Sequence, residues 1–385
     1  MINKPLDNCE GWLNQLQALR ALAFLGIFIS HSGLSSQLGA WGVSIFFVLS
    51  GFLTAYNSNN KKLPSGIKES LKYSINKILK LYPLHIVMML SAIPYEIQRS
   101  GQLGYRSNIG LWVLNTLSSV SLTESWFPTW TVFGSYNGVA WFLSALLFLY
   151  FCFPGVISRI RNRNRNQIIA IMIIIYAVMF LFTWLTRNIV FGGTYPDNCY
   201  WSAYTFPVLR LGDFVIGCCA GLLFKLKSDY KSTKETVVFT LLEIISFELV
   251  GLSMCYYSSQ SNILGQNWFR YTMLWLPTSV LLVWLFAVNK GLISKLLNNK
   301  LFVWVGNISS ITFLTHYMVI FYIEYLFNHT LHDPLQAIVE NVGFFDTELF
   351  FRIIRCIFAL IITIMLSVFW KRVSKNVFKH RKSFY

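Results

Sequence analysis

Charged residues are scarce in this 385-residue chain: they make up 12% of it, against 55% hydrophobic residues, and its mean hydropathy is +0.52. Acidic side chains are the scarcer kind, with 16 Asp and Glu beside 32 Lys and Arg. A composition so poor in charge excludes an ordinary soluble protein. Apolar runs of about 18 or more residues recur along the chain instead, and they predict an all-α protein that crosses a membrane many times.

Cysteine is also sparse, and its placement excludes two common roles. The count of seven is odd, and five of the seven lie in apolar segments, so the sequence does not predict a disulfide framework. No cysteine pair has the spacing of zinc ligands, and the six histidines do not cluster with the cysteines, so no metal site is predicted. The five cysteines are Cys152, Cys218, Cys219, Cys255 and Cys356.

Ten segments are apolar enough, and long enough, to be predicted as membrane-spanning helices. They lie near 17–36, 39–56, 81–97, 138–157, 167–186, 207–226, 237–257, 272–289, 303–327 and 349–370. An eleventh segment, 107–124, is less apolar and is interrupted by Asn, Ser and Thr.

The basic residues decide the orientation. With the N-terminus in the cytoplasm, the loops on the inner side hold 23 Lys and Arg, whereas those on the outer side hold only Arg99, Arg106, Arg187 and Arg270. This asymmetry follows the positive-inside rule, so the net charge of +16 predicts membrane orientation and no nucleic-acid partner. A span at 107–124 would reverse it, so we expect a surface or re-entrant helix there. The prediction is a single integral-membrane domain, residues 1–385, with ten spans and both termini cytoplasmic.

An arginine and a histidine share the first predicted span. Arg20 and His31 are eleven positions apart, which is within about 20° of three full helical turns, so they lie on one helix face. Their separation along the helix axis is roughly 16 Å. Ionisable groups inside an apolar span are costly and are therefore functional candidates. The alternative for His31 is a packing role, with a hydrogen bond to a neighbouring helix.

A basic pair lies on the same predicted side of the membrane as Arg20. Lys77 and Lys80 are about one helical turn apart, just before the third span. Cations at one end and an imidazole some 15 Å away match a coenzyme A thioester, in which phosphates precede a long narrow arm. We therefore expect Arg20, Lys77, Lys80 and Ser50 at the donor site, with His31 as the base for an acceptor hydroxyl. The alternative is that the two lysines only set the membrane orientation, as positive-inside residues.

Four stretches resemble the acyltransferase-3 family of bacterial integral-membrane O-acyltransferases. They are Arg20 with His31, GVSIFFVLSGFL from Gly42 to Leu53, KILKLYP from Lys77 to Pro83, and VGNISSITFLTH from Val305 to His316. The resemblance implies transfer of an acyl group, usually acetyl, from cytosolic acetyl-CoA to a carbohydrate at or beyond the outer face. It also implies that Arg20 and His31 take part in using the acyl donor.

The chain departs from that family pattern at two places. The basic pair is usually arginine, and lysine keeps the charge but loses the bidentate geometry. Many members carry a glutamate after Trp-Ser-Leu, whereas here the run WFLSALLFLY places Leu146 at that position. The chain therefore resembles the Trp-Phe-Leu variants, and those without the fused extracytoplasmic hydrolase-like domain.

Polar and aromatic residues near the outer ends of the spans are candidates for the acceptor site. We expect Trp141, Arg210, Asp213, Glu324 and Arg352 to contribute to it, although mutual ion pairing is the alternative for the charged ones. The depth of His316 matches that of His31, so it is a catalytic candidate or else a hydrogen-bonded bundle residue.

Together these features predict a multi-pass enzyme of the bacterial inner membrane. Its partners are an acyl-CoA donor, the lipid bilayer, and an envelope polysaccharide or lipid-linked glycan such as O-antigen, capsule or exopolysaccharide. A transporter of a small anion or lipid-linked sugar is the rival, because charges within the membrane fit that function too. The chain lacks the paired interrupted helices that many transporters show. A non-catalytic scaffold or sensor is the third possibility.

Overall fold

The structure is a computed structural model that describes residues 9–35, 37–58, 63–190, 200–226, 234–259, 271–331 and 347–379. Within these ranges every regular element is a helix, as the sequence predicts. Of the loops that the topology places on the outer side, 258–271 and 328–348 lie largely outside these ranges, and 187–206 lies outside them at 191–199. Seven of the described helices are long and apolar enough to cross a membrane. They are α2 (Leu38–Ser58), α8 (Trp141–Ile160), α9 (Arg165–Leu185), α11 (Pro207–Lys225), α12 (Lys234–Ser259), α15 (Lys300–Leu326) and α17 (Thr347–Lys379).

The other three predicted spans also contain helices, but with different bounds. Helix α1 covers Cys9–His31 and ends before the predicted residue 36, because Gly33 adopts φ +76°, a left-handed conformation that terminates helices. Helix α13 covers only Leu276–Val288.

The prediction of one continuous helix over 81–97 is wrong. The chain forms two short helices there, α4 (Tyr82–Ser91) and α5 (Ile93–Gln102), which meet at Ala92. Pro94 is the cause: its ring nitrogen cannot donate a backbone hydrogen bond, and proline is tolerated only in the first turn of a helix. The segment 107–124 contains the expected additional helix, α6 (Ile109–Ser121).

Asparagines begin several of these helices. Asn164 accepts a hydrogen bond from the Gln167 backbone, and the Gln167 side chain accepts one from the Asn164 backbone, which makes a capping box at the start of α9. Asn299 caps α15, and Asn108 caps α6, by accepting from backbone N–H groups of the first turn. The chain therefore encodes these helix starts locally.

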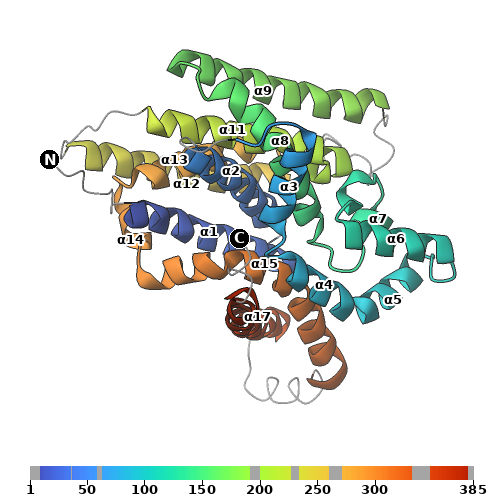
Figure 1. Ribbon diagram of the computed structural model, residues 1–385. Helices are drawn as coiled ribbons and strands as arrows, with labels where there is room; N and C mark the ends of the chain where they lie inside the picture. Colours follow the sequence, from blue (N-terminus) through green and yellow to red (C-terminus); the bar gives the residue numbers. More distant parts are fainter. Residues whose placement is uncertain are drawn as a thin grey trace.

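Helix α2 lies at the centre of the bundle, with α1 and α11 beside it (Figure 1). Its glycines permit the close approach. A Cβ on Gly51 would stand 2.0 Å from the Phe214 carbonyl oxygen of α11, and one on Gly42 would stand 2.4 Å from the Ala23 carbonyl oxygen of α1. Such small residues let membrane helices pack backbone to backbone. This packing brings α1, α2 and α11 into one core.

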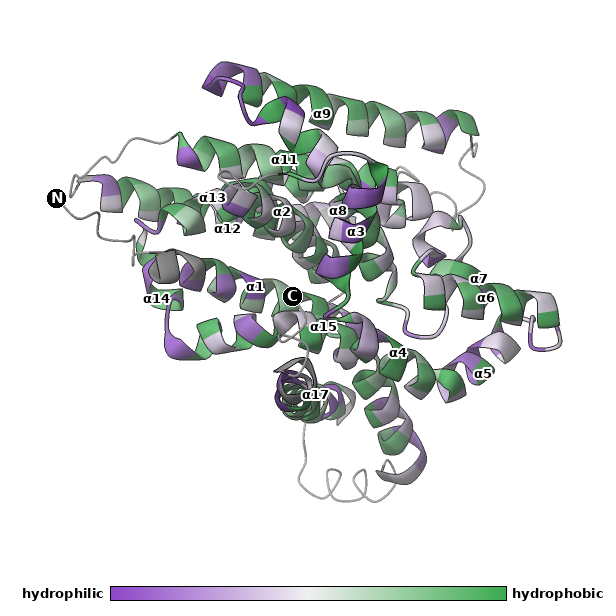
Figure 2. Ribbon diagram, in the orientation of Figure 1, coloured by the Kyte–Doolittle hydropathy of each residue, from purple (hydrophilic) through white to green (hydrophobic). Residues whose placement is uncertain are grey.

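The helices α9, α12 and α17 form the periphery. In each of them only 17% of an apolar stretch of 18 residues is buried inside the molecule, and the residues that face outward are apolar. Figure 2 shows α9 as apolar along nearly its whole length, with polar residues at its ends. An exposed apolar surface of this length is suited to contact with the lipid of a bilayer and not with water. The chain is therefore a multi-pass membrane protein.

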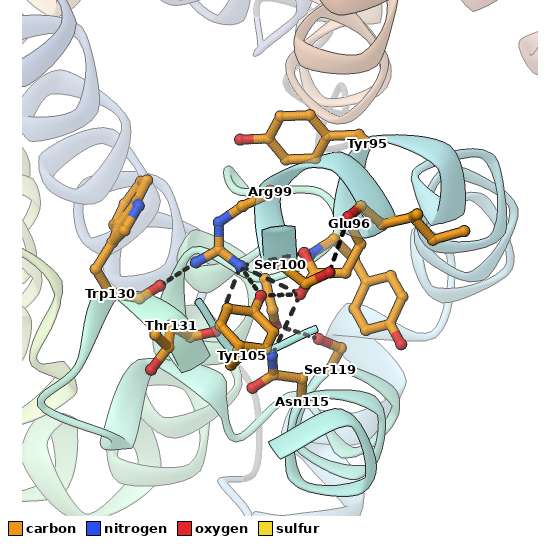
Figure 3. A network of polar contacts seen from close by, with 12 residues as sticks. Tyr95, Glu96, Arg99, Ser100, Tyr105, Asn115, Ser119, Trp130 and Thr131 are labelled. Atoms are coloured by element: carbon orange, nitrogen blue, oxygen red, sulfur yellow. Dashed lines mark hydrogen bonds and ion pairs between the residues drawn. The ribbon is translucent and has the colours of Figure 1, made fainter. Parts of the chain in front are cut away.

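A buried polar network organises the segment between α4 and α8 (Figure 3). The Glu96 carboxylate pairs with Arg99, at 3.1 Å, and accepts a hydrogen bond from the Tyr105 hydroxyl, at 2.5 Å. Arg99 also donates to the Trp130 carbonyl oxygen of α7 (Trp130–Phe133). Because these groups are buried and mutually bonded, they fix α5, α6 and α7 against one another.

Candidate active site

A cavity of about 280 Å³ lies among α1, α2, α8, α15 and the short amphipathic helix α3 (Ile67–Ile78). A second cavity, of about 180 Å³, shares four of its lining residues. We call the two together the donor cavity, because they contain the residues that the sequence analysis predicts for a donor site. The shared residues are Arg20, Ser50, Lys77 and Tyr150. Three residues that the sequence assigns to donor binding therefore line both parts, and Lys80 lines the larger one.

Arg20 is partly buried and held from two sides. Its Nη2 donates a hydrogen bond to the Ser310 hydroxyl of α15 at 2.9 Å, and its guanidinium carbon lies 5.9 Å from the centroid of the Phe46 ring. Both contacts keep the guanidinium at the cavity wall, where it can still donate to an anion because it carries five N–H groups. Arg20 is therefore oriented toward the cavity before any ligand binds.

The two lysines lie where α3 turns into α4. Lys77 is in the last turn of α3, and its ammonium lies 5.4 Å from the Tyr73 ring centroid and 5.8 Å from that of Tyr150. Lys80 follows in the short connection to α4. Both lysines are exposed, so the donor cavity reaches the surface of the molecule beside two cations.

The wall that α2, α8 and α15 contribute to the donor cavity is apolar and aromatic. Phe46 of α2, Phe142 of α8 and Phe313 of α15 form a three-ring cluster with centroid distances of 4.9 to 6.1 Å. Leu146 also lines the cavity. The family's acidic position is therefore an apolar wall here.

The two histidines form a direct contact. Nδ1 of His31 lies 2.7 Å from Nε2 of His316, and the rings stack with their centroids 5.0 Å apart. His316 is fully buried, whereas His31 is exposed at the end of α1. Neither lines the donor cavity; the Phe313 ring lies between, 5.8 Å from that of His316. The sequence indicates their similar depth but not this contact.

Several residues of this region escaped the sequence analysis. Ser310, Phe313 and Leu314 line the donor cavity, and Tyr317 lies edge-on to His31 with a centroid distance of 5.4 Å. These four residues are spaced at i, i+3, i+4 and i+7, so they lie on one face of α15. That spacing is the sequence signal that could have identified them.

Three of the predicted acceptor residues form a separate buried cluster. The Arg210 guanidinium pairs with Asp213 at 2.6 Å, as the spacing allows, and lies 5.9 Å from the Trp141 ring centroid. Both members of the ion pair are completely buried. Among the described residues, Nη2 of Arg210 and Oδ1 of Asp213 have no hydrogen-bond partner. None of the three residues lines the donor cavity.

The other two predicted acceptor residues lie elsewhere. Glu324 of α15 is exposed and lines a small cavity with Ser32 and Arg355, at the histidine end of α1. Arg352 is exposed on α17. The structure thus brings three of the five predicted acceptor residues together and leaves Glu324 and Arg352 apart from them, and the role of all five in binding an acceptor stays a prediction.

One buried carboxyl was not singled out by the sequence. Glu124 begins a short turn next to α8, and neither carboxyl oxygen has a hydrogen-bond partner from another residue in the described ranges. Its burial raises the pKa of the carboxyl from 4.5 to about 8. Elsewhere in the described chain, no three His, Cys, Asp or Glu side chains gather as a metal site.

Comparison with known proteins assigns the chain to a family. The family described as "Acyltransferase domain" matches residues 13–370. The acyltransferase MdmB of Streptomyces mycarofaciens is 25% identical over 234 residues, which cover 55% of this chain and 58% of MdmB. The peptidoglycan O-acetyltransferase OatA of Listeria monocytogenes is 22% identical over 355 residues, which cover 89% of this chain and 55% of OatA. The chain thus spans little more than half the length of these relatives. No solved structure matches it. With nearly its whole length matched, the chain belongs to the acyltransferase-3 family of membrane O-acyltransferases.

Proposed function

We propose that this protein transfers an acyl group, most simply acetyl, from cytosolic acyl-CoA to a hydroxyl of a cell-envelope glycan. The observation that carries the proposal is the donor cavity. Lys77 and Lys80 lie where it opens to the surface, and Arg20 lies farther in, against Phe46. Its inner part is apolar and reaches the three-ring cluster beside the histidine pair. A ligand with phosphates at one end, a slim arm and a small apolar group at the other end is complementary to a cavity that changes from cationic to apolar along its length.

The proposed topology has ten spans, the third made of the two short helices α4 and α5 in place of one continuous helix. Both termini lie in the cytoplasm of a bacterial cell, and the protein lies in its inner membrane. The distribution of Lys and Arg between alternate loops supports it. In this orientation the donor cavity opens toward the cytosol, where acyl-CoA is available. His31, at the far end of α1, then lies toward the outer side.

The residues of the donor cavity have distinct tasks in this proposal. Lys77 and Lys80 neutralise phosphates at the exposed end, and Arg20 adds a guanidinium whose geometry matches phosphate oxygens. Ser50 and Ser310 line the donor cavity, and their hydroxyls can bond to polar groups along the arm of the CoA thioester. The phenylalanine rings exclude water from the thioester, and His31 removes the proton from the attacking hydroxyl.

The acceptor is proposed to be an envelope polysaccharide or lipid-linked glycan. The name of the relative OatA, a peptidoglycan O-acetyltransferase, supports a glycan of the cell envelope. Glu324, in the small cavity at the histidine end of α1, supports an acceptor entrance on the side opposite the donor cavity. The buried cluster of Trp141, Arg210 and Asp213, with its unused polar atoms, is the second proposed contribution.

The test follows labelled acetyl-CoA into envelope glycan, with the purified protein in liposomes. We expect glycan-dependent label transfer by the wild type and none by His31→Ala. Lys77→Ala should raise the KM for acetyl-CoA by about tenfold, because one charge-assisted phosphate contact is lost. Lys72→Ala is the matched control, since Lys72 lies on the same helix outside the donor cavity and should leave KM unchanged.

The opposite outcomes are equally clear. Full label transfer by a folded His31→Ala protein removes the proposed base. Flux of a sugar or an anion through the liposomes without acetyl-CoA consumption supports the transporter instead.

A further inference from the structure

The hydrogen bonds of the histidine pair determine where their protons are. Nδ1 of His316 lies 2.7 Å from the Phe313 carbonyl oxygen. A carbonyl oxygen only accepts, so Nδ1 of His316 carries the proton. A neutral imidazole has one donor nitrogen and one acceptor nitrogen, so Nε2 of His316 is an acceptor. The proton in the contact at 2.7 Å between the rings therefore belongs to Nδ1 of His31. Nε2 of His31 is left with a lone pair.

The surroundings favour this neutral arrangement. His316 is completely buried, and three phenylalanine rings lie within 6.3 Å of its own ring, centroid to centroid. A charged imidazolium is unfavourable among such apolar groups. The three rings are those of Phe24, Phe28 and Phe313.

The two histidines differ in their access to ligands. His316 has both ring nitrogens engaged and no exposed surface, so it cannot touch a substrate. His31 is exposed, and its Nε2 has no hydrogen-bond partner among the described residues. An acceptor hydroxyl can therefore reach only Nε2 of His31.

We infer that His316 is a positioning residue that holds His31 in the tautomer whose Nε2 is the catalytic base. The inference rests on the proposed function. In the transfer step, Nε2 of His31 takes the proton of the acceptor hydroxyl while the oxygen bonds to the thioester carbonyl carbon. The carbon–sulfur bond then breaks, and the proton passes from Nε2 to the departing sulfur, giving a free thiol. Throughout, Nδ1 of His31 keeps its proton and its bond to His316.

Two substitutions of similar size separate this role from simple packing. Gln in place of His316 can present its side-chain oxygen where Nε2 stood, and so can still accept from His31. Asn is one methylene shorter and reproduces only the Nδ1 side of the ring. We expect His316→Asn to lower kcat for acetyl transfer at least 100-fold, the scale of losing an oriented general base, and His316→Gln to stay within about tenfold of wild type.

The KM for acetyl-CoA is the second readout. Because His316 does not line the donor cavity, both variants should keep that KM within about twofold of the wild-type value. The control is His85→Asn, which removes another buried histidine bonded to a backbone carbonyl, that of Ser119, and should leave kcat unchanged.

The outcomes are distinguishable. A wild-type protein that consumes no acetyl-CoA overturns the proposed function itself. If the wild type is active, the inference is overturned by an unimpaired His316→Asn protein or by equal losses in the Asn and Gln variants. If either variant does not fold, ¹⁵N chemical shifts of labelled histidine in the wild type decide. A protonated Nδ1 and an unprotonated Nε2 on His31 support the inference, and the reverse overturns it.

Discussion

The three-ring cluster at the inner end of the donor cavity should limit the length of the transferred acyl group. Phe142→Ala removes one of its rings and opens space beside Phe313 and Phe46. Each methylene buried in that space contributes about 0.8 kcal/mol, or about a fourfold gain in kcat/KM. Butyryl has two methylenes more than acetyl, so the ratio of butyryl to acetyl transfer should rise about 15-fold.

The assay is CoA release from acetyl-CoA and butyryl-CoA by purified protein, with the ratio of the two kcat/KM values as the readout. A ratio is preferable to a rate, because removing a core phenylalanine also costs about 3 to 5 kcal/mol of stability. Phe153→Ala is the matched control: Phe153 is on the same helix and is 1% exposed, but it packs against Phe214 and does not line the donor cavity.

If the folded Phe142→Ala protein keeps the wild-type ratio, the three-ring cluster does not limit acyl length. If Phe153→Ala raises the ratio as much, the effect comes from general loosening of α8 and not from the cavity wall.

Three further predictions concern stability in detergent, measured as the midpoint of thermal unfolding. Gly51→Ala should destabilise the bundle by about 1–3 kcal/mol or more, because its Cβ would stand 2.0 Å from the backbone of α11. Gly251→Ala, where a Cβ meets nothing within 4 Å, should cause no loss, and equal effects at the two positions would contradict the packing argument. Between pH 4.5 and 8 the folded state keeps a proton on Glu124 that the unfolded chain releases, so stability should fall by up to about 1.4 kcal/mol per pH unit as the pH rises through that window. Glu124→Gln should remove this part of the slope, and an unchanged slope would show that Glu124 is not its source. Arg99→Ala should cost about 3–5 kcal/mol, because it leaves the Glu96 carboxylate buried without its cation; a shift as small as that of a surface substitution would show that the carboxylate is solvated.

Much of the fold is predictable because the signals for it are local. The length and hydropathy of each apolar run predict a helix, and the helices of the structure fall on all ten predicted spans. Proline decides the exception: Pro94 interrupts the segment 81–97, although the hydropathy of that segment is continuous. Hydropathy averages over a window and does not register a single missing N–H.

The candidate site is predictable in part for the same reason. Arg20 and His31 lie on one helix, so their spacing along the axis follows from helical geometry alone. Lys77 and Lys80 belong to one turn of the chain, and the structure places both at the donor cavity with Arg20. These relations need no knowledge of which helix packs against which.

Only the tertiary structure decided which side chains of different helices contact one another. The contact of His31 with His316, 285 positions later, depends on how α1 and α15 rotate about their axes when they pack. The same holds for the bond from Arg20 to Ser310 and for the contact of the buried Arg210–Asp213 pair with Trp141. The sequence by itself determined the helices, the sign and position of their charges, and the polar groups inside them. Helix rotation and pairing decided which of those groups meet, because they result from the packing of all the side chains at once.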